Sequence, residues 1–232
     1  MRINVYISSA GYCSRRRADR YIKEGHVTIN GERATLWSHV QEGDEVRVLD
    51  EVIHPREHTT YVMLNKPRGI ICTAAQDVPG NVIECINYPE RIFPIGRLDN
   101  QSEGLLLLTN DGPIVNDLLK KEAQVEKEYV VTVNREITPD FIKGLAVGVS
   151  IYNPRVKGHT TTSPCKVTQL NDYQFSIVLI EGLNRQIRRM CRRFQYTVTH
   201  LQRVRMKHLQ LGDLPIGEWR YLTEEEIHGL KG

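Results

Sequence analysis

A loop bounded by glycines places a cation and a carboxylate two residues apart. Gly96 and Gly104 enclose Arg97 and Asp99, and the apolar run 105–108 follows directly. A basic and an acidic side chain in a loop that leads into a buried strand resemble a reactive site displayed on a rigid scaffold. A carboxylate in such a place can attack a carbon or remove a proton. An aspartate that only forms the turn is the alternative, and the loop alone leaves both interpretations open.

A second candidate is an arginine-rich segment. Between Glu181 and Asp213 the chain has no carboxylate side chain but carries Arg185, Arg188, Arg189, Arg192, Arg193, Arg203, Arg205 and Lys207. On a helix over 184–194, one face would carry Arg185, Arg188, Arg189 and Arg192. The opposite face would carry Ile187, Met190, Cys191 and Phe194, so the helix should pack through its apolar side. Phosphates suit four presented guanidinium groups. Pairing of these arginines with carboxylates distant in sequence is the alternative.

A third cluster lies near the N-terminus, where five cations are opposed only by Asp19. Ser14 is expected to cap the helix that carries them, and the cations are Arg15, Arg16, Arg17, Arg20 and Lys23. Basic residues at the start of a helix oppose its dipole, and a bound phosphate would relieve that repulsion. A basic face that is only solvated is the other interpretation.

The elements that would position these groups fall into two parts. Apolar spacing predicts a first helix that ends at Gly11 and a second that runs from Ser14 to Gly25. The dipeptide Asn30-Gly31 predicts a hairpin, and a further strand follows around residues 46–48. Residues 51–60 are polar and contain Pro55, so we expect a linker between this small module and the rest of the chain.

From residue 61 onward, strands and helices alternate without a regular strand–helix–strand rhythm. The predicted strands cover residues 61–64, 69–73, 105–109, 128–133, 165–170, 175–180 and 197–204. The predicted helices cover residues 82–86, 114–120, 139–144, 184–194 and 223–230. This pattern favours the α+β class with a mainly antiparallel sheet.

Composition excludes several classes of protein. The 232 residues are 25% charged and 40% hydrophobic, with a net charge of +3, which excludes a polycationic coat and an acidic disordered tail. The five cysteines are scattered and have no metal-ligand spacing, as expected for reduced thiols. We expect a cytoplasmic protein, because no secretory signal is visible and the apolar run 105–108 is too short to span a bilayer.

Five segments, in order along the chain, resemble one family. Residues 96–99 and the following 102–109 are similar to the catalytic loop of pseudouridine synthases of the RsuA/RluB/RluE/RluF type. Residues 65–69 resemble their first motif, 127–129 their tyrosine motif and 182–190 their third motif. Residues 13–16 and 25–31 resemble an S4 RNA-binding domain. The likeness spans nearly the whole chain, and within the family residues 127–133 and 182–191 are most like an enzyme of the large ribosomal subunit.

The resemblance implies a fold and a division of the chain. An S4 RNA-binding domain would occupy residues 1–50, followed by a linker over 51–60. The catalytic domain would occupy residues 61–232 and contain a long mixed, largely antiparallel sheet, with the active-site cleft across its middle. The S4 cations would hold phosphates away from the reacting base and select the stem–loop that is presented. These S4 contacts are Ser14, Arg15, Arg16, Arg17, Arg20 and Lys23.

The resemblance also implies roles for single residues. Asp99 matches the catalytic aspartate, acting as nucleophile or base, and Arg188 matches the arginine that would pair with it and keep it ionised. Ile187 would form an apolar wall for the uracil, and Tyr129 would stack on the base. Arg97 would fill the gap that the uridine leaves in its stack, while Lys66 is expected to be structural. The remaining substrate contacts would be Leu98, Asn100, Arg185 and Gln186.

The implied activity is isomerisation of a specific uridine to pseudouridine in structured RNA. The expected RNA is 23S ribosomal RNA, with a tRNA as an additional candidate. A stacked uridine is inaccessible, so the base must be flipped out of its helix. The family uses no metal, nucleotide or redox cofactor. We therefore expect no cofactor. We also expect a monomer that needs no obligate protein partner and does not bind a membrane.

Two other functions are alternatives, and the sequence differs from the family pattern at two places. A non-catalytic RNA binder would not need Asp99, Tyr129 and Arg188 together. A glycosidase needs two carboxylates across the bond, and Glu103 has no assigned role. Val5 stands where the family usually has a lysine, so one phosphate contact is expected to be missing. Residues 152–163 are longer and more polar than the family pattern and are expected to reshape a loop that contacts RNA.

Overall fold

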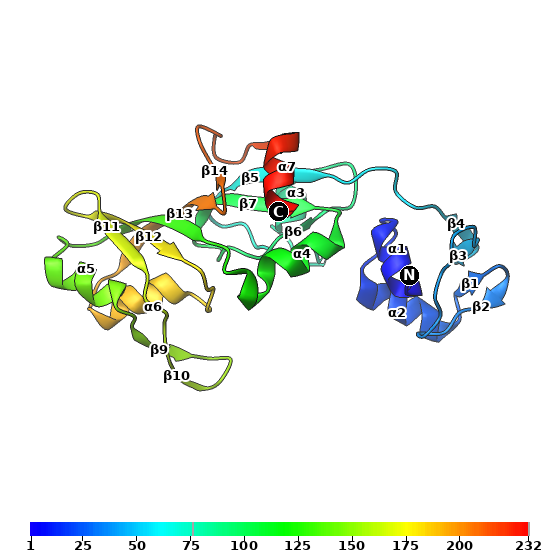
Figure 1. Cartoon of the computed structure of the whole chain (residues 1–232), viewed down its shortest axis with the longest axis horizontal. Coiled ribbons are helices and arrows are strands. Elements are labelled where there is room, and N and C mark those ends of the chain that lie inside the picture. The colour runs from blue at the N-terminus through cyan, green and yellow to red at the C-terminus, as the bar shows by residue number, and fades with distance from the viewer. Residues whose placement is uncertain (76, 232) are drawn as a thin grey trace. The chain divides into compact units, whose positions relative to one another are not determined.

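The computed structural model describes residues 1–75 and 77–231, which form two compact units (Figure 1). The first unit comprises Met1–Thr60 with Tyr88–Phe93 and Thr109–Gly112, and the second comprises the rest of the chain. Gln76 and Gly232 belong to the predicted catalytic domain and lie outside the described residues.

The first unit consists of two helices and a four-stranded antiparallel sheet with the order β2-β1-β3-β4. Its elements are α1 (Ile3–Ser9), α2 (Arg15–Glu24), β1 (Val27–Ile29), β2 (Glu32–Arg33), β3 (Val46–Val48) and β4 (Glu51–Ile53). The expected N-cap is confirmed, because Ser14 Oγ accepts a hydrogen bond from the Arg17 N–H at 3.2 Å. Gly25 ends α2 in the left-handed conformation, as predicted. Apolar faces of both helices, including Ile3, Ile7, Ala18 and Ile22, are buried against the sheet's apolar residues.

Residues 51–60, expected to be a linker, begin with a strand instead. β4 pairs with β3, and Ile53 is buried in the core of the first unit. Arg56 Nη1 donates to the Arg91 carbonyl at 2.9 Å, and Thr109 Oγ1 donates to the Thr60 carbonyl at 2.6 Å. The segment is therefore partly ordered by strand pairing and by these hydrogen bonds, which its polar composition does not reveal. The division into an S4 domain (1–50) and a catalytic domain (61–232) stays a prediction.

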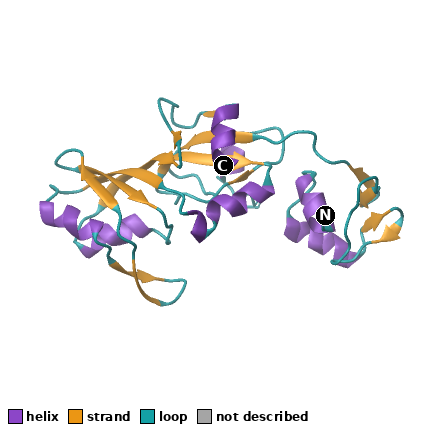
Figure 2. Ribbon diagram, in the orientation of Figure 1, coloured by secondary structure: helices purple, strands orange, loops and turns teal. Residues whose placement is uncertain are grey.

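The second unit is built on a nine-stranded mixed sheet (Figure 2). Its strands are β5 (Tyr61–Lys66), β6 (Phe93–Pro94), β7 (Glu103–Thr109), β8 (Lys127–Val133), β11 (Lys166–Gln169), β12 (Gln174–Leu179), β13 (Val198–Met206), β14 (Leu209–Gln210) and β15 (Trp219–Tyr221). The order is β11-β12-β8-β13-β7-β5-β15, with β14 paired to β13 and β6 to β7. The expected mixed, largely antiparallel sheet is confirmed.

A single parallel contact joins two halves of this sheet. β13 pairs with β7 only through Gln202 with Glu103 and Arg203 with Gly104. Gly104 has φ +103°, and a Cβ there would lie 2.3 Å from the Arg203 carbonyl oxygen, so only glycine allows this approach. Separate apolar cores lie in the two halves, one around Phe141, Phe175 and Met190 and the other around Met63, Leu105 and Leu107.

Helices cover the sheet and one hairpin projects from it. The helical segments are α3 (Val82–Ile86), α4 (Gly112–Leu119), a 3₁₀ turn (Lys121–Ala123), α5 (Pro139–Ala146), α6 (Gln186–Arg193) and α7 (Glu224–Lys231). The hairpin of β9 (Ser150–Asn153) and β10 (Gly158–Thr161) forms a two-stranded sheet of its own, seen below α6 in Figure 1. This hairpin includes most of residues 152–163, the segment that differs from the family pattern and for which we expected a loop.

The strand expected over residues 69–73 is absent. Gly69 has a left-handed φ of +88°, and Ile71 forms one isolated bridge to Asn81. The Ile71 N–H donates to the Gly80 carbonyl and the Ile71 carbonyl accepts from the Val82 N–H, so this backbone joins the loop before α3. Of the apolar residues there, Cys72 is buried but Ile71 is 40% exposed, so the apolar run that predicts a short buried strand does not form one.

Candidate active site

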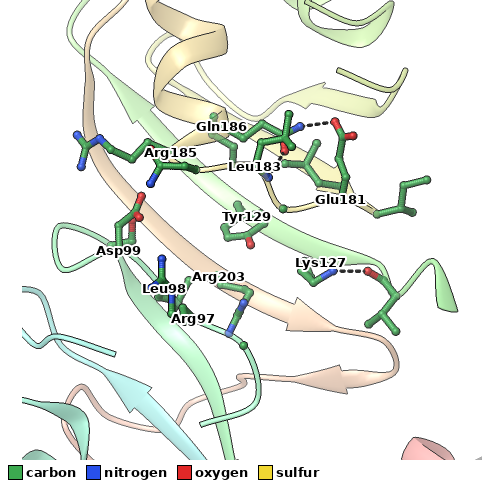
Figure 3. Close-up of a pocket in the computed structure, with 18 of the residues that line it drawn as sticks. Arg97, Leu98, Asp99, Lys127, Tyr129, Glu181, Leu183, Arg185, Gln186 and Arg203 are labelled. Carbon is green, nitrogen blue, oxygen red and sulfur yellow. Dashed lines mark hydrogen bonds between the residues drawn. The ribbon is translucent and has the colours of Figure 1, made fainter. Parts of the chain in front are cut away.

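A cavity of about 740 Å³ lies in the second unit and is lined from both halves of the sheet (Figure 3). The loop before β7 contributes Arg97, Leu98, Asp99 and Ser102. The opposite half contributes Lys127, Tyr129, Arg203 and the segment 179–188. Asp99 faces the side of the cavity where Arg185 lies, with Tyr129 near the centre. A volume of this size is typical of a small-molecule site.

The loop that carries Asp99 is held by hydrogen bonds to separate segments and by one within its own turn. Lys66 is fully buried, and its Nζ donates to the Ser102 carbonyl at 2.9 Å. The Gly69 N–H donates to the Asn100 carbonyl at 2.6 Å, and the Leu98 N–H donates to Cys72 Sγ at 3.3 Å. The Ser102 N–H donates to the Asp99 carbonyl at 3.0 Å, which closes the turn. The Asp99 side chain is therefore displayed on a backbone with little freedom to move.

Arg188 ties this loop to α6. Its Nη2 donates to the Gln101 carbonyl at 2.8 Å, and its Nη1 donates to the Val198 carbonyl at 3.2 Å. Burial lowers the pKa of Arg188, and the charge of Asp99 opposes that shift. Within the described residues, no ion pair shorter than 4.0 Å joins Arg188 to Asp99, contrary to the direct pairing that we expected. The guanidinium instead bonds to the backbone beside Asp99 and stays within electrostatic range of the carboxylate.

The predicted face of four arginines is wrong in part. α6 begins at Gln186 rather than 184, because Arg185 takes a left-handed conformation with φ +50° just before it. Arg189, like Arg188, donates to nearby backbone, with Nη1 bound to the Tyr152 carbonyl at 2.7 Å. Arg185 and Arg192 are exposed, so only part of the row faces solvent.

Pairing with distant carboxylates, the alternative interpretation, holds for another basic residue of the same stretch. Arg205 bonds to Glu126 at 2.9 Å and to Glu128 at 3.0 Å. The acid-free stretch of sequence is therefore partly neutralised by carboxylates from β8 and the residue before it.

Gln186 stabilises the turn before α6 instead of presenting its amide to solvent. It is 4% exposed, its Nε2 donates to Glu181 Oε1 at 2.6 Å, and its Oε1 accepts from the Leu183 N–H at 3.0 Å. Glu181 also accepts from the Ser163 N–H at 3.0 Å, which ties the turn to the end of the β9–β10 hairpin. Gln186 therefore shapes the cavity wall, and its expected contact with RNA stays a prediction.

The cavity brings together most of the predicted substrate contacts. Arg97, Leu98, Asp99, Tyr129, Arg185, Gln186, Ile187 and Arg188 all line it. Asn100 does not: its side chain is exposed and its carbonyl is bound to the Gly69 N–H. Glu103 also lies outside the lining and bonds to His200 Nε2 at 2.7 Å, so the second carboxylate of a glycosidase is not supplied by Glu103.

Two cations in the cavity wall were not assigned a role from the sequence. Arg203 is 2% exposed and donates from Nε to the Leu105 carbonyl at 2.7 Å, while its buried Nη2 has no hydrogen-bond partner among the described residues. Lys127 donates to the Val125 carbonyl at 2.8 Å, and burial, assisted by the charge of Arg203, lowers its pKa to about 8. In the sequence, Lys127 belongs to the tyrosine motif and Arg203 to the arginine-rich segment. The register of β13 beside β8 places Arg203 opposite Tyr129, and only this pairing brings Arg203 near Lys127.

The predicted S4 cations lie on one helix of the first unit. Ser14 caps α2, and five exposed cations follow: Arg15, Arg16, Arg17, Arg20 and Lys23. Arg17 bonds to the Tyr21 hydroxyl at 3.0 Å, and Asp19 accepts from Asn4 Nδ2 at 2.8 Å. No ion pair within 4.0 Å neutralises these five cations in the described part of the chain. The face is free to meet an anion.

Two general findings concern the described residues 1–75 and 77–231. No three His, Cys, Asp or Glu side chains gather there in a way that could hold a metal ion. Each helix in this part of the chain is too short or too polar to cross a lipid bilayer.

Comparison with known proteins places the chain in a class. The family of RNA pseudouridylate synthases matches residues 60–193, and the S4 domain family matches residues 1–46. A crystal structure of a pseudouridylate synthase superposes with a TM-score of 0.72 at 29% identity, covering 99% of each chain. Fold and site thus define an RNA pseudouridine synthase with an N-terminal S4 domain.

Two curated relatives narrow the assignment. The dual-specificity RNA pseudouridine synthase RluF of Escherichia coli (strain K12) is 47% identical over 229 residues, which is 98% of this chain and 77% of the relative. The ribosomal large subunit pseudouridine synthase B of Bacillus subtilis (strain 168) is 36% identical over 237 residues, or 99% of this chain and 95% of the relative. The chain belongs to the RNA pseudouridylate synthase family, is related to its RluB/RsuA-type members, and isomerises uridine in RNA.

Proposed function

We propose that this enzyme isomerises a specific uridine in structured RNA, with Asp99 as the catalytic carboxylate. Its main substrate is 23S ribosomal RNA, and a tRNA is an additional substrate. The observation that carries the proposal is the rigid loop that displays Asp99 in a cavity of nucleotide size. The names of the two relatives, one of dual specificity and one of the large ribosomal subunit, support the choice of RNA.

The reaction divides between the two sides of the cavity. Uracil N1 separates from the ribose C1′, the ring turns, and C5 forms the new bond to C1′; C5 then releases its proton and N1 gains one, so that the product is an isomer of the substrate. Asp99 supports this exchange by attacking the nucleoside or by removing a sugar proton. Tyr129 and Ile187 hold the faces of the extruded uracil, and Arg97 occupies the space that base flipping leaves in the RNA. Arg185 binds phosphate at the rim, since its guanidinium is exposed.

The RNA substrate also binds to the first unit, away from the cavity. Ser14 and the cations of α2 bind RNA phosphates outside the reacting nucleotide, so the first unit selects the stem–loop. We further propose that the protein acts in the cytoplasm as a monomer, without a cofactor or an obligate protein partner. The bacterial origin of the relatives supports the compartment.

The experiment maps pseudouridine in ribosomal RNA and tRNA from cells that lack the gene. The cells are complemented with wild type, with Asp99→Asn, or with Asp213→Asn, which alters an exposed carboxylate outside the cavity. We expect wild type and Asp213→Asn to restore the same sites in 23S ribosomal RNA and tRNA, and Asp99→Asn to restore none. Restoration by Asp99→Asn would show that Asp99 is not the catalyst, and restoration of a site in another RNA would refute the proposed substrate.

A further inference from the structure

Trp37 is the most exposed large apolar side chain of the first unit. Its side chain is 75% exposed, although tryptophan is among the residues that gain most from burial. The backbone beneath it is well fixed. The Thr35 N–H donates to Ser38 Oγ at 2.9 Å, and the Ser38 N–H donates to the Thr35 carbonyl at 3.1 Å. An indole held in solvent on a firm turn loses little conformational entropy when a partner binds it.

The turn that carries Trp37 is bound to the start of the chain. The Ile3 N–H donates to the Ser38 carbonyl at 3.1 Å, and the Met1 carbonyl accepts from the Val40 N–H at 2.8 Å. These bonds bring Arg2 over the indole, with its guanidinium carbon 5.7 Å from the ring centroid. An aromatic ring and a guanidinium are thus displayed together.

The surroundings of this pair are basic. Asn4, two residues after Arg2, donates to Asp19 of α2 at 2.8 Å, so the start of α1 lies beside α2. On α2, Arg16 and Lys23 lie one helical turn before and after Asp19. The phosphate-binding face of α2 and the Arg2–Trp37 pair therefore belong to neighbouring parts of the same unit. A ligand that suits both is polyanionic and carries flat rings, which describes an RNA strand with unpaired bases.

We propose that Trp37 and Arg2 form a stacking site for an unpaired nucleobase of the RNA that α2 holds by its phosphates. The inference rests on the proposed RNA-binding role of the first unit and adds a base-contacting site outside the catalytic cavity. The indole stacks on the base, and Arg2 binds the adjacent phosphate. Because every base has a flat face, the site distinguishes unpaired from paired nucleotides rather than one base from another.

The test compares two synthetic RNAs, a blunt-ended duplex without a loop and the same duplex with a short single-stranded adenosine overhang. We expect wild type to bind the overhang RNA about tenfold more tightly, and Trp37→Ala to lose that difference while keeping its affinity for the blunt RNA. Trp37→Phe should keep most of the preference because a ring remains. Tyr173→Ala, which removes an aromatic side chain that is 50% exposed in the second unit, should behave as wild type.

Two further readouts separate stacking from charge. The slope of affinity against salt should be unchanged in Trp37→Ala and smaller in Arg16→Ala, because only the second variant loses a phosphate contact. The chain has two tryptophans, so Trp219→Phe leaves Trp37 as the single reporter, and its fluorescence should be quenched by the overhang RNA alone.

The inference is overturned if Trp37→Ala retains the preference for the overhang, if it loses affinity for both RNAs equally, or if the indole fluorescence does not respond. If the wild-type protein binds neither RNA, the inference and the proposed binding of RNA phosphates by α2 are both overturned. A wild type that binds both RNAs equally, yet still forms pseudouridine through Asp99, overturns the inference alone.

Discussion

Replacement of Arg188 by methionine tests whether hydrogen bonds position the loop that carries Asp99, the proposed catalytic residue. The variant loses two charge-assisted bonds, to Gln101 at 2.8 Å and to Val198 at 3.2 Å, each of a type that contributes about 1.5–3 kcal/mol. Burial lowers the pKa of Arg188, so removal of the charge returns some desolvation free energy, and the side chain is only half-buried. We expect a net loss of about 2 kcal/mol, or a Tm decrease of about 4–8 °C for a chain of this size.

The effect on catalysis should exceed the effect on stability. With Gln101 released, Asp99 two residues away is free to shift, and a displacement of about 1 Å costs about 100-fold in rate. The assay is release of tritium from RNA labelled at uracil C5, because that hydrogen is lost when C5 bonds to C1′. We expect kcat to fall about 100-fold while KM changes little, which is the pattern of a lost transition-state interaction.

Arg189→Met is the matched control. Arg189 donates to the Tyr152 carbonyl and to Asn184 Oδ1, outside the Asp99 loop, so its loss should lower Tm similarly while kcat stays within about twofold of wild type. Arg188→Lys keeps a charge but not the two-pronged donation, and should resemble Arg188→Met. If Arg188→Met keeps the wild-type kcat, the reasoning fails. If Arg188→Lys restores kcat fully, charge alone is responsible and the positioning argument is refuted.

Two further predictions concern the centre of the sheet. Gly104→Ala should lower the free energy of unfolding by about 3 kcal/mol or more, measured by urea denaturation, because its Cβ would meet the Arg203 carbonyl at 2.3 Å; an unchanged midpoint would contradict the close approach. Burial lowers the pKa of Lys127 from 10.5 to about 8, so between these values the unfolded chain binds the extra proton and wild-type stability should gain with rising pH relative to Lys127→Met. Parallel stability curves for the two proteins from pH 8 to pH 10 would exclude that shift.

The local elements could be predicted where the signal lies within a few residues. Ser14 before the basic helix and Gly25 after it marked the ends of α2, and Asn30-Gly31 marked the first hairpin. The strand prediction over residues 69–73 failed because Ile71 forms its backbone hydrogen bonds with Gly80 and Val82, in the loop before and at the start of α3, rather than along a neighbouring strand. The strand β4 was missed because Glu51 gives it a polar start, and only its pairing with β3 makes it a strand.

The candidate site shows the same division between local and distant information. A family resemblance indicated Asp99, Tyr129 and Arg188, and the structure brings these side chains to one cavity. Helical spacing alone overestimated the exposed arginine face, since carbonyl groups from distant segments bind Arg188 and Arg189. Arg203 received no role because its place in the cavity depends on the register between β13 and its two neighbours, which no single segment encodes.

The hydrogen bonds of the Asp99 loop connect motifs that lie far apart in the sequence. Lys66 from the first motif binds the Ser102 carbonyl, and Arg188 from the third motif binds the Gln101 carbonyl, so both act on the backbone of the loop that carries Asp99. The two interpretations of Asp99 are therefore compatible. Its carbonyl closes the turn with the Ser102 N–H, while its side chain lines the cavity. Because the turn fixes where the carboxylate points, an aspartate that forms a turn is compatible with the catalytic role that we propose for Asp99.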